Sequence, residues 1–339
     1  MLANQSDRKR LETVLTGGIP DRVPYCEFEV SARHVNYVLG REINLKSTDL
    51  SPADYVEFTK RIGCDFLYYN YLWELGRVYQ SDARGQRHYS GGSIKRASDL
   101  DKITRPDITA ALKRIKKLAE YCETNNLGLI LGFSPPYKTA LHAVGHEDFF
   151  IKTCTEKRFI LKLQEIIMHY ASEILRDFLN YPISAFFVHG DVCYKTGPML
   201  NPAMTRELWL ESTKEFIKPV KKNGKPVILH MDGNFSPIID MILEIEPDAI
   251  HPFEPCGRMD IYAFKRLYGK RITVIGNIDL TGALCFGTPA QVTEAVKTHI
   301  ENLAPGGRYM CGSSHEITAD VPLENFTALI ESVSKFGKY

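Results

Sequence analysis

The stretch Lys225-Pro-Val-Ile-Leu-His-Met-Asp-Gly-Asn234 decides the fold class of this chain. Residues 226–229 are apolar without polar alternation, which is typical of a strand buried on both faces in a parallel sheet. His230 and Asp232 follow at its carboxyl end, and the two-residue period of a strand points both side chains to one side. α/β proteins place their chemistry at such strand ends. Alternatively, His230 caps its own turn and Asp232 belongs to a Gly-Asn loop, and this stretch alone does not decide between the two.

Length and composition narrow the class of protein. A chain of 339 residues forms one large domain or two, and 44% apolar with 24% charged residues is typical of a soluble globular protein. The formal net charge of +1 gives no reason to expect nucleic acid as a partner. No apolar run reaches the roughly 18 residues of a membrane span, and the polar first residues do not resemble a signal peptide. The eight cysteines form no CxxC pair, so we expect reduced thiols and a cytoplasmic location.

The rest of the chain alternates predicted strands and helices. The predicted strands are 23–29, 65–71, 127–133, 183–189, 226–229, 248–254, 271–277 and 308–312. Helices are predicted at 6–17, 32–39, 52–62, 109–124, in a stretch reaching 180, from 201 onward, and at 237–245, 259–268, 289–302 and 323–335. Residues 72–106 are polar and irregular, which indicates a β-excursion or a lid after the second strand.

Eight strand–helix alternations predict an α/β fold, a single (β/α)8 TIM barrel over residues 1–339 with an insertion after strand two. A doubly wound open sheet is the rival fold. It normally carries a Gly-rich first turn, but here no glycine follows the first strand until Gly40. No linker or break in composition divides the chain, so we expect one barrel domain.

Ligand-type side chains cluster at the carboxyl ends of the predicted strands. In chain order they are Glu27 and Glu29, Asn70, Ser134, His189 and Asp191, His230 and Asp232, Glu254, Asn277 and Asp279, and Cys311 and His315. The opposite strand ends carry residues suited to solvated turns, without a comparable set of His and Cys. Because the carboxyl ends of barrel strands meet at one mouth, this asymmetry predicts an active site there.

A divalent metal is one interpretation of this cluster. His230, Asp232, Glu254 and either His315 or Cys311 offer nitrogen, oxygen and sulfur donors that zinc accepts, and a catalytic zinc keeps one position open. A set of only nitrogen and oxygen donors also suits iron or manganese. Alternatively, His230 and Asp232 form a hydrogen-bonded pair and Glu254 is a solvated loop acid.

Other members of the cluster have structural and functional interpretations. Asp191 either caps a Gly-Asp turn or serves as a general acid or substrate contact. His189 directly precedes a glycine, and for this residue a core position is slightly favoured over a role as a ligand. Of Glu27 and Glu29, at most one is expected to point into the mouth.

Five segments resemble the uroporphyrinogen decarboxylase superfamily. They are Pro20-Asp-Arg-Val-Pro24, Gly197-Pro-Met-Leu-Asn-Pro202, Gly224-Lys-Pro-Val-Ile-Leu-His-Met-Asp-Gly-Asn234, Ile275-Gly-Asn-Ile-Asp279 and Pro322-Leu-Glu-Asn325. The resemblance covers nearly the whole chain and is most specific in its second half. It implies a (β/α)8 barrel, which agrees with the strand count.

The superfamily holds two chemistries, and the first does not fit this sequence well. True uroporphyrinogen decarboxylases carry a loop of the type Met-Arg-Gln-Ala-Gly-Arg-Tyr after strand one, which grips the porphyrinogen carboxylates. This chain has Glu27-Phe-Glu-Val-Ser-Ala-Arg-His34 there instead. A single Arg33 beside two acids lacks the bidentate pairing that a polyanionic tetrapyrrole needs.

The second chemistry is that of the cobamide-dependent methyltransferases, which bind zinc through His-x-Cys, a later Cys and a nearby Glu. Here His230-x-Asp232 stands in place of His-x-Cys, and Glu254 in a His-Pro-Phe-Glu-Pro run matches the Glu. The later Cys aligns with His315, and Cys311 remains a competitor. Replacing thiolates by Asp and His makes the metal harder, which suits an ether or alcohol oxygen.

The resemblance therefore implies a zinc-dependent methyltransferase that moves a methyl group between a small substrate and a corrinoid held by a separate protein. In this respect the chain resembles the first methyltransferase of O-demethylase systems, whose substrates are methoxylated aromatics. We expect Asp191, Glu29 and Asn70 to be catalytic, and Asn277 and Asp279 to contact the cofactor. The alternatives are a decarboxylase of a smaller carboxylated substrate, or a barrel that binds a tetrapyrrole or corrinoid without chemistry of its own.

Overall fold

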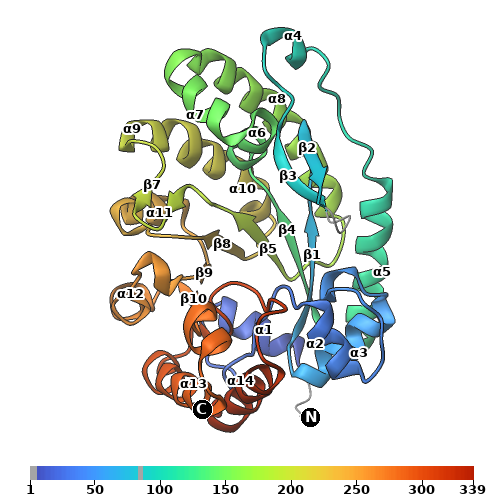
Figure 1. The fold of residues 1–339 in the computed structure, drawn as a ribbon, viewed down its shortest axis with the longest axis vertical. Helices are drawn as coiled ribbons and strands as arrows, with labels where there is room; N and C mark the ends of the chain where they lie inside the picture. The colour runs from blue at the N-terminus through green and yellow to red at the C-terminus, as the bar shows by residue number, and fades with distance from the viewer. Residues whose placement is uncertain (1–5, 83–86) are drawn as a thin grey trace.

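A computed structural model describes residues 6–82 and 87–339, and within them seven parallel strands form the main sheet (Figure 1). Each strand pairs with the next along the chain, so the order is sequential and the sheet curls. The strands are β1 (Phe66–Tyr71), β4 (Gly128–Phe133), β5 (Ala185–His189), β8 (Val227–Met231), β9 (Ala249–Pro252), β10 (Thr273–Ile275) and β11 (Tyr309–Met310). Parallel strands in chain order with helical connections are the arrangement of a TIM barrel, so the predicted α/β fold class is confirmed.

The predicted first strand, 23–29, differs from a regular strand. Tyr25 makes single parallel bridges to Cys64, which precedes β1, and to Cys311, which follows β11. Cys26 N donates to Cys311 O and Cys311 N donates to Pro24 O, both at 2.9 Å. Pro24 has no N–H to extend the ladder, so the pairing stays short. This segment nevertheless lies between the two edges of the seven-stranded sheet, in the place of the eighth strand.

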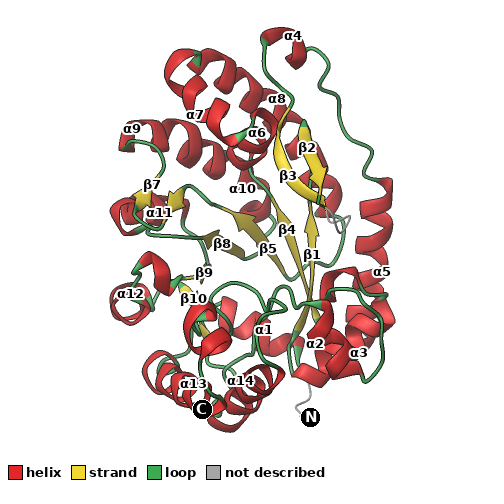
Figure 2. Cartoon of the chain, viewed as in Figure 1, coloured by secondary structure: helices red, strands yellow, loops and turns green. Residues whose placement is uncertain are grey.

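Helices surround the sheet, as Figure 2 shows. They are α1 (Arg8–Leu15), α2 (Ala32–Leu39), α3 (Pro52–Ile62), α4 (Ala97–Leu100), α5 (Thr109–Asn125), α6 (Pro136–Val144), α7 (His146–Thr155), α8 (Lys157–Phe178), α9 (Pro202–Thr205), α10 (Glu211–Lys222), α11 (Ile239–Ile245), α12 (Ile261–Tyr268), α13 (Pro289–Leu303) and α14 (Leu323–Phe336). Local signals set their ends: in α3, Ser51 Oγ accepts from Asp54 N, Pro52 opens the first turn, and Gly63 at φ 74° ends the helix. None of the helices in the described ranges is long and apolar enough to cross a membrane.

The predicted insertion after the second strand is a hairpin followed by a short helix. Strands β2 (Arg77–Ser81) and β3 (Arg87–Gly92) pair antiparallel directly after β1, and Figure 1 shows them beside α6. Tyr89 Oη donates to His142 O at 2.9 Å, and Ile94 N donates to Ala143 O at 3.0 Å. The hairpin is therefore fixed to α6. A second, smaller hairpin of β6 (Cys193–Tyr194) and β7 (Gly197–Pro198) follows β5.

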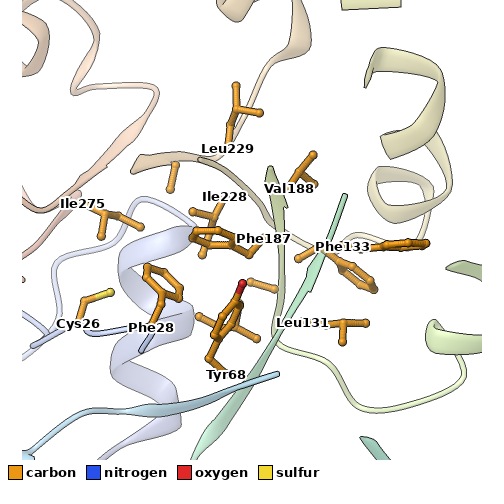
Figure 3. Packing of buried hydrophobic residues seen from close by; sticks show 14 of the residues in the cluster. Cys26, Phe28, Tyr68, Leu131, Phe133, Phe187, Val188, Ile228, Leu229 and Ile275 are labelled. Atoms are coloured by element: carbon orange, nitrogen blue, oxygen red, sulfur yellow. The ribbon is translucent and has the colours of Figure 1, made fainter. Parts of the chain in front are cut away.

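Three aromatic rings fill the barrel interior. Phe28, Tyr68 and Phe187 lie close together in Figure 3, with ring centroids 4.4 to 5.3 Å apart. They come from the segment around Tyr25, from β1 and from β5, so they meet across the inside of the sheet. We call these three rings the aromatic floor. The opposite face packs on the helices: the Phe133 ring of β4 lies 5.2 Å from Phe216 of α10 and 5.8 Å from Phe178 of α8.

Candidate metal centre at the barrel mouth

Three histidines stand side by side on adjacent strands above the aromatic floor. The register pairs His189 of β5 with His230 of β8, and His230 with His251 of β9. Residues in register on neighbouring parallel strands point to the same side of the sheet. The Phe187 ring lies 5.2 Å from the His230 ring and 5.6 Å from the His251 ring, so that side is the barrel interior.

His230, Asp232 and His315 converge at this mouth, and we call them the Asp232 triad. Asp232 Oδ2 lies 3.3 Å from His230 Nε2 and 3.5 Å from His315 Nε2. The potential ligand atoms of the three residues lie within 4.8 Å of one another. The loop after β11 therefore places the His315 ring beside the His230 ring, with the two ring centroids 5.6 Å apart.

His251 orients the ring of His230. The two Nδ1 atoms are 2.9 Å apart, so one ring must donate to the other. Burial lowers the pKa of His251 well below its ordinary value, so this ring is neutral. If His230 is to ligate through Nε2, its Nδ1–H is the donor and His251 Nδ1 accepts. Ligand histidines typically donate their second ring N–H in this way. His251 is not among the site residues predicted from the sequence, although its place in the predicted sixth strand, beside His230 in the fifth, was a usable signal.

A second group shares His230 and comprises His189, Asp191 and His230. We call it the Asp191 triad, because its potential ligand atoms also lie within 4.8 Å of one another. Asp191 Oδ1 is 3.5 Å from His230 Nε2, and Asp191 Oδ2 is paired with Lys138 Nζ. His189 Nε2 lies 3.0 Å from Asn70 Oδ1. Lys138 projects from α6, and no strand-end pattern in the sequence could have indicated it.

Charges at the mouth are mutually stabilised. Burial raises the pKa of Asp232, but the neighbouring imidazoles of His230 and His315 outweigh it and hold that pKa far below the ordinary value. The hydrogen bond with Asp232 raises the pKa of His315 to about 9. Burial likewise raises the pKa of Asp191, yet Lys138 and His230 bring it below its usual range. Both aspartates are therefore carboxylates at neutral pH.

The other two residues considered as metal ligands lie outside both triads. Glu254 Oε2 accepts from Gly233 N at 2.8 Å and so holds the loop that follows Asp232. Cys311 is fully buried in the core, and burial raises the pKa of its thiol to about 12. The eight cysteines are all free thiols, as expected.

The remaining predicted site residues have partners of their own. Glu29 accepts from Lys46 Nζ at 2.8 Å and from Thr48 Oγ1 at 3.1 Å. Asn277 is buried, donates to Phe253 O and accepts from His299 Nε2. Asp279 Oδ1 accepts from Thr281 N at 3.0 Å and begins a short helical segment.

Residues 23–29, which lie between the two edges of the sheet, are called the closing segment, and Glu27 is more deeply buried there than Glu29. It accepts from Ser313 N and Ser313 Oγ, each at 2.7 Å. Its burial raises the pKa of this carboxyl to about 8. Glu27 therefore ties the closing segment to the loop that carries His315, two residues beyond Ser313.

The chemistry of the Asp232 triad fits a divalent metal. Asp232 Oδ1 and Asp191 Oδ1 are buried and accept no hydrogen bond from the described residues. A buried carboxylate oxygen without a donor is costly, and a cation at this position would satisfy it. Two imidazoles and one carboxylate are a donor set that zinc uses, and three protein ligands leave a position open for substrate.

Comparisons with known proteins agree with the fold. Residues 86–336 match the family "Uroporphyrinogen decarboxylase (URO-D)". Uroporphyrinogen decarboxylase from Coxiella burnetii is 22% identical over 254 residues, covering 72% of this chain and 68% of the relative. The enzyme of that name from Hydrogenovibrio crunogenus is 23% identical over 255 residues, covering 72% and 70%. The solved structure of a methyltransferase from Methanosarcina mazei superposes with a TM-score of 0.76 at 16% identity, covering 97% of this chain and 98% of its own. The family match spans well over half of the chain, which therefore belongs to the uroporphyrinogen decarboxylase family.

Proposed function

We propose that this protein is a zinc-dependent methyltransferase that transfers a methyl group between a methoxylated aromatic and a corrinoid carried by a separate protein. The observation that carries the proposal is the convergence of His230, Asp232 and His315. Asp232 Oδ2 faces both imidazoles, and Asp232 Oδ1 is buried without a hydrogen bond from the described residues. The family, and a methyltransferase as a neighbour that shares the fold over nearly the whole chain, support a methyltransferase-like function.

The anion-binding groups at the mouth argue against a uroporphyrinogen substrate. Arg33, the one arginine between Glu27 and His34, donates to Ala319 O at 3.0 Å. Lys138 and Lys46 are already paired with Asp191 and Glu29. A tetrapyrrole with many carboxylates needs several free cations arranged for bidentate contact, and these side chains do not provide them.

The contacts at the mouth suggest a role for each residue of the proposed site. His230, Asp232 and His315 would hold the metal, with His251 fixing the ring of His230. Bound zinc would supply a Lewis acid that polarises the ether oxygen of the substrate. The bond between that oxygen and the methyl carbon would break with its electron pair left on the oxygen, and a Co(I) corrinoid on the partner protein is the reagent that would take up the methyl group with an electron pair of its own. The phenolate that leaves takes a proton from solvent.

The neighbouring side chains shape the space around the open position. The aromatic floor excludes water from below the histidines, which strengthens electrostatic interactions at the metal. We assign the contact with substrate to Asp191 and Asn70, which lie on the same side of the mouth as His189. Glu254 as a fourth ligand, Glu29 as a catalytic group, and Asn277 and Asp279 as corrinoid contacts stay predictions.

The proposal is tested by metal content and by methyl transfer. We expect about one zinc per chain after dialysis, and demethylation of a methoxylated aromatic only when cob(I)alamin or a corrinoid protein is added. His230→Ala and His315→Ala should lose both metal and activity, and Glu254→Ala should lose them if it is the fourth ligand. Cys311→Ala, a deletion at a buried thiol outside the triad, is the control and should keep most of both.

Two results would contradict the proposal. Normal zinc content in all of these variants would place the metal elsewhere. Release of carbon dioxide from a carboxylated substrate by metal-free protein would favour the decarboxylase alternative.

A further inference from the structure

The two triads cannot bind metal at the same time. Both use His230, and the Nε2 atom of His230 is the one that faces both Asp191 Oδ1, at 3.5 Å, and Asp232 Oδ2, at 3.3 Å. One imidazole nitrogen has one lone pair and binds one metal ion. An ion that enters the mouth must therefore settle on the Asp191 side or on the Asp232 side of His230.

The two sides of His230 differ in the side chains that contact the aspartate there. On the Asp191 side, Lys138 pairs with Asp191 Oδ2 and Asn70 Oδ1 accepts from His189 Nε2. On the other side, Asp232 and His315 contact each other and His230, and no lysine or arginine of the described residues pairs with Asp232. Each aspartate keeps a buried Oδ1 without a hydrogen bond in the described part of the chain, so the lysine is what distinguishes the two sides. A divalent cation beside Asp191 would also lie against the ammonium of Lys138, which would repel it.

We infer that Lys138 selects the metal-binding triad: by pairing with Asp191, it closes the Asp191 side to cations and directs the metal to His230, Asp232 and His315. The inference rests on the metal centre of the proposed function and adds a role for a helix residue outside the ligand set. Lys138 is a positioning residue, because it acts through Asp191 and not on the metal itself.

The test uses the zinc affinity of the full-length protein, measured by competition with a chelator, in variants that force the choice between the triads. His315→Ala alone should lose the metal, because the Asp232 triad is broken and the Asp191 triad is closed. Adding Lys138→Met should restore zinc binding by at least roughly tenfold, the lower end of what a neighbouring partner contributes to metal affinity. Adding Asp191→Asn to that double variant should remove the gain.

Matched changes at position 138 separate charge from packing. Lys138→Arg in the His315→Ala background keeps the positive charge and should not restore zinc, whereas Lys138→Gln removes the charge without an apolar side chain and should. Cobalt(II) absorption of the restored site gives a readout independent of activity, because the spectrum depends on the ligands. It should differ from that of the wild-type site.

The outcomes distinguish the inference from the function on which it rests. If wild-type protein binds zinc and Lys138→Met with His315→Ala stays as metal-poor as His315→Ala alone, Lys138 does not select the triad and the metal centre stands. Equal restoration by Lys138→Arg would likewise overturn the role of charge. If wild-type protein binds no zinc, the proposed function and this inference both fail.

Discussion

His230 is held on both of its ring nitrogens by side chains of different kinds. Its Nδ1 meets His251 at 2.9 Å, while its Nε2 faces Asp191 and Asp232. The two rings stack with an interplanar angle of 27°, so His251 limits rotation of His230 as well as fixing its tautomer. A ligand whose orientation is fixed before the metal arrives binds it more tightly.

This arrangement predicts a graded response at position 251. His251→Phe keeps a stacked ring but removes the acceptor for His230 Nδ1–H, so zinc affinity should fall by about 10–100-fold. His251→Gln offers an amide oxygen as acceptor and should be milder. Chelator competition measures both variants, with circular dichroism to verify folding. Unchanged affinity in His251→Phe would show that the contact between the two rings does not support the metal site.

At this scale the sequence indicates candidate ligands more readily than it indicates the side chains that contact them. His230 and Asp232 could be identified because a buried strand ends at them, and the period of a strand fixes their side. Lys138 could not, because a helix residue reaches the mouth through its long side chain and through the packing of α6. Such a contact depends on tertiary geometry, which leaves no periodic signal in the residues around it.

Strand prediction from the sequence succeeds for β8 and is less accurate for the closing segment. Strand β8 is buried at every position, and its unbroken apolar run already indicates that. The closing segment around Tyr25 has a strand-like sequence, but Pro24 limits its ladder to single bridges. Its place in the barrel depends instead on contacts with residues far along the chain, such as Cys311 and Ser313.

Gly312 is the point at which this closing segment can be tested. A Cβ at this position would collide with the backbone carbonyl of Cys26, so Gly312→Ala must push β11 away from the segment. We expect it to lower the free energy of unfolding by about 3 kcal/mol or more. It should also weaken zinc binding, because the displaced backbone leads to His315. Gly40→Ala is the control. A Cβ at Gly40 would meet no atom within 4 Å, but this residue has a φ of 71°. The substitution should therefore lower the free energy of unfolding only by the cost of a left-handed backbone, about 1 kcal/mol. Urea unfolding measures both, and equal losses would mean that the collision is relieved without cost.

In the whole molecule, closing the barrel brings the first and last parts of the chain together. Val23 N donates to Gly337 O at 2.7 Å, and Arg22 forms an antiparallel bridge with Lys338. His34 of α2 adds a buried contact of the same kind: its Nε2 lies 2.9 Å from Val321 O, and its Nδ1 lies 2.8 Å from Ser31 Oγ. With Nε2–H donating to the carbonyl and Nδ1 accepting from the hydroxyl, the neutral ring has a partner on each nitrogen.

This neutral ring makes global stability depend on pH. Burial lowers the pKa of His34 from 6.5 to about 4 in the folded protein. Between these values the unfolded chain binds a proton at His34 and the folded protein does not, so the free energy of unfolding falls as the pH falls. The contribution of His34 amounts to at most about 3 kcal/mol over the full range.

His34→Gln removes this one titration. Between about pH 6.5 and pH 5 the wild-type protein should therefore lose about 2 kcal/mol more stability than the variant does, and urea unfolding at the two pH values measures that difference. Burial also lowers the pKa of His299 to about 4. His299 and other buried histidines titrate equally in both proteins, so their contributions to the difference in stability cancel. Equal losses in the two proteins, or a His34 pKa near 6.5 by NMR, would mean that the contact between α2 and Val321 opens to water in solution. The barrel would then depend for its closure on the backbone pairing of Val23 and Arg22 with the last residues of the chain.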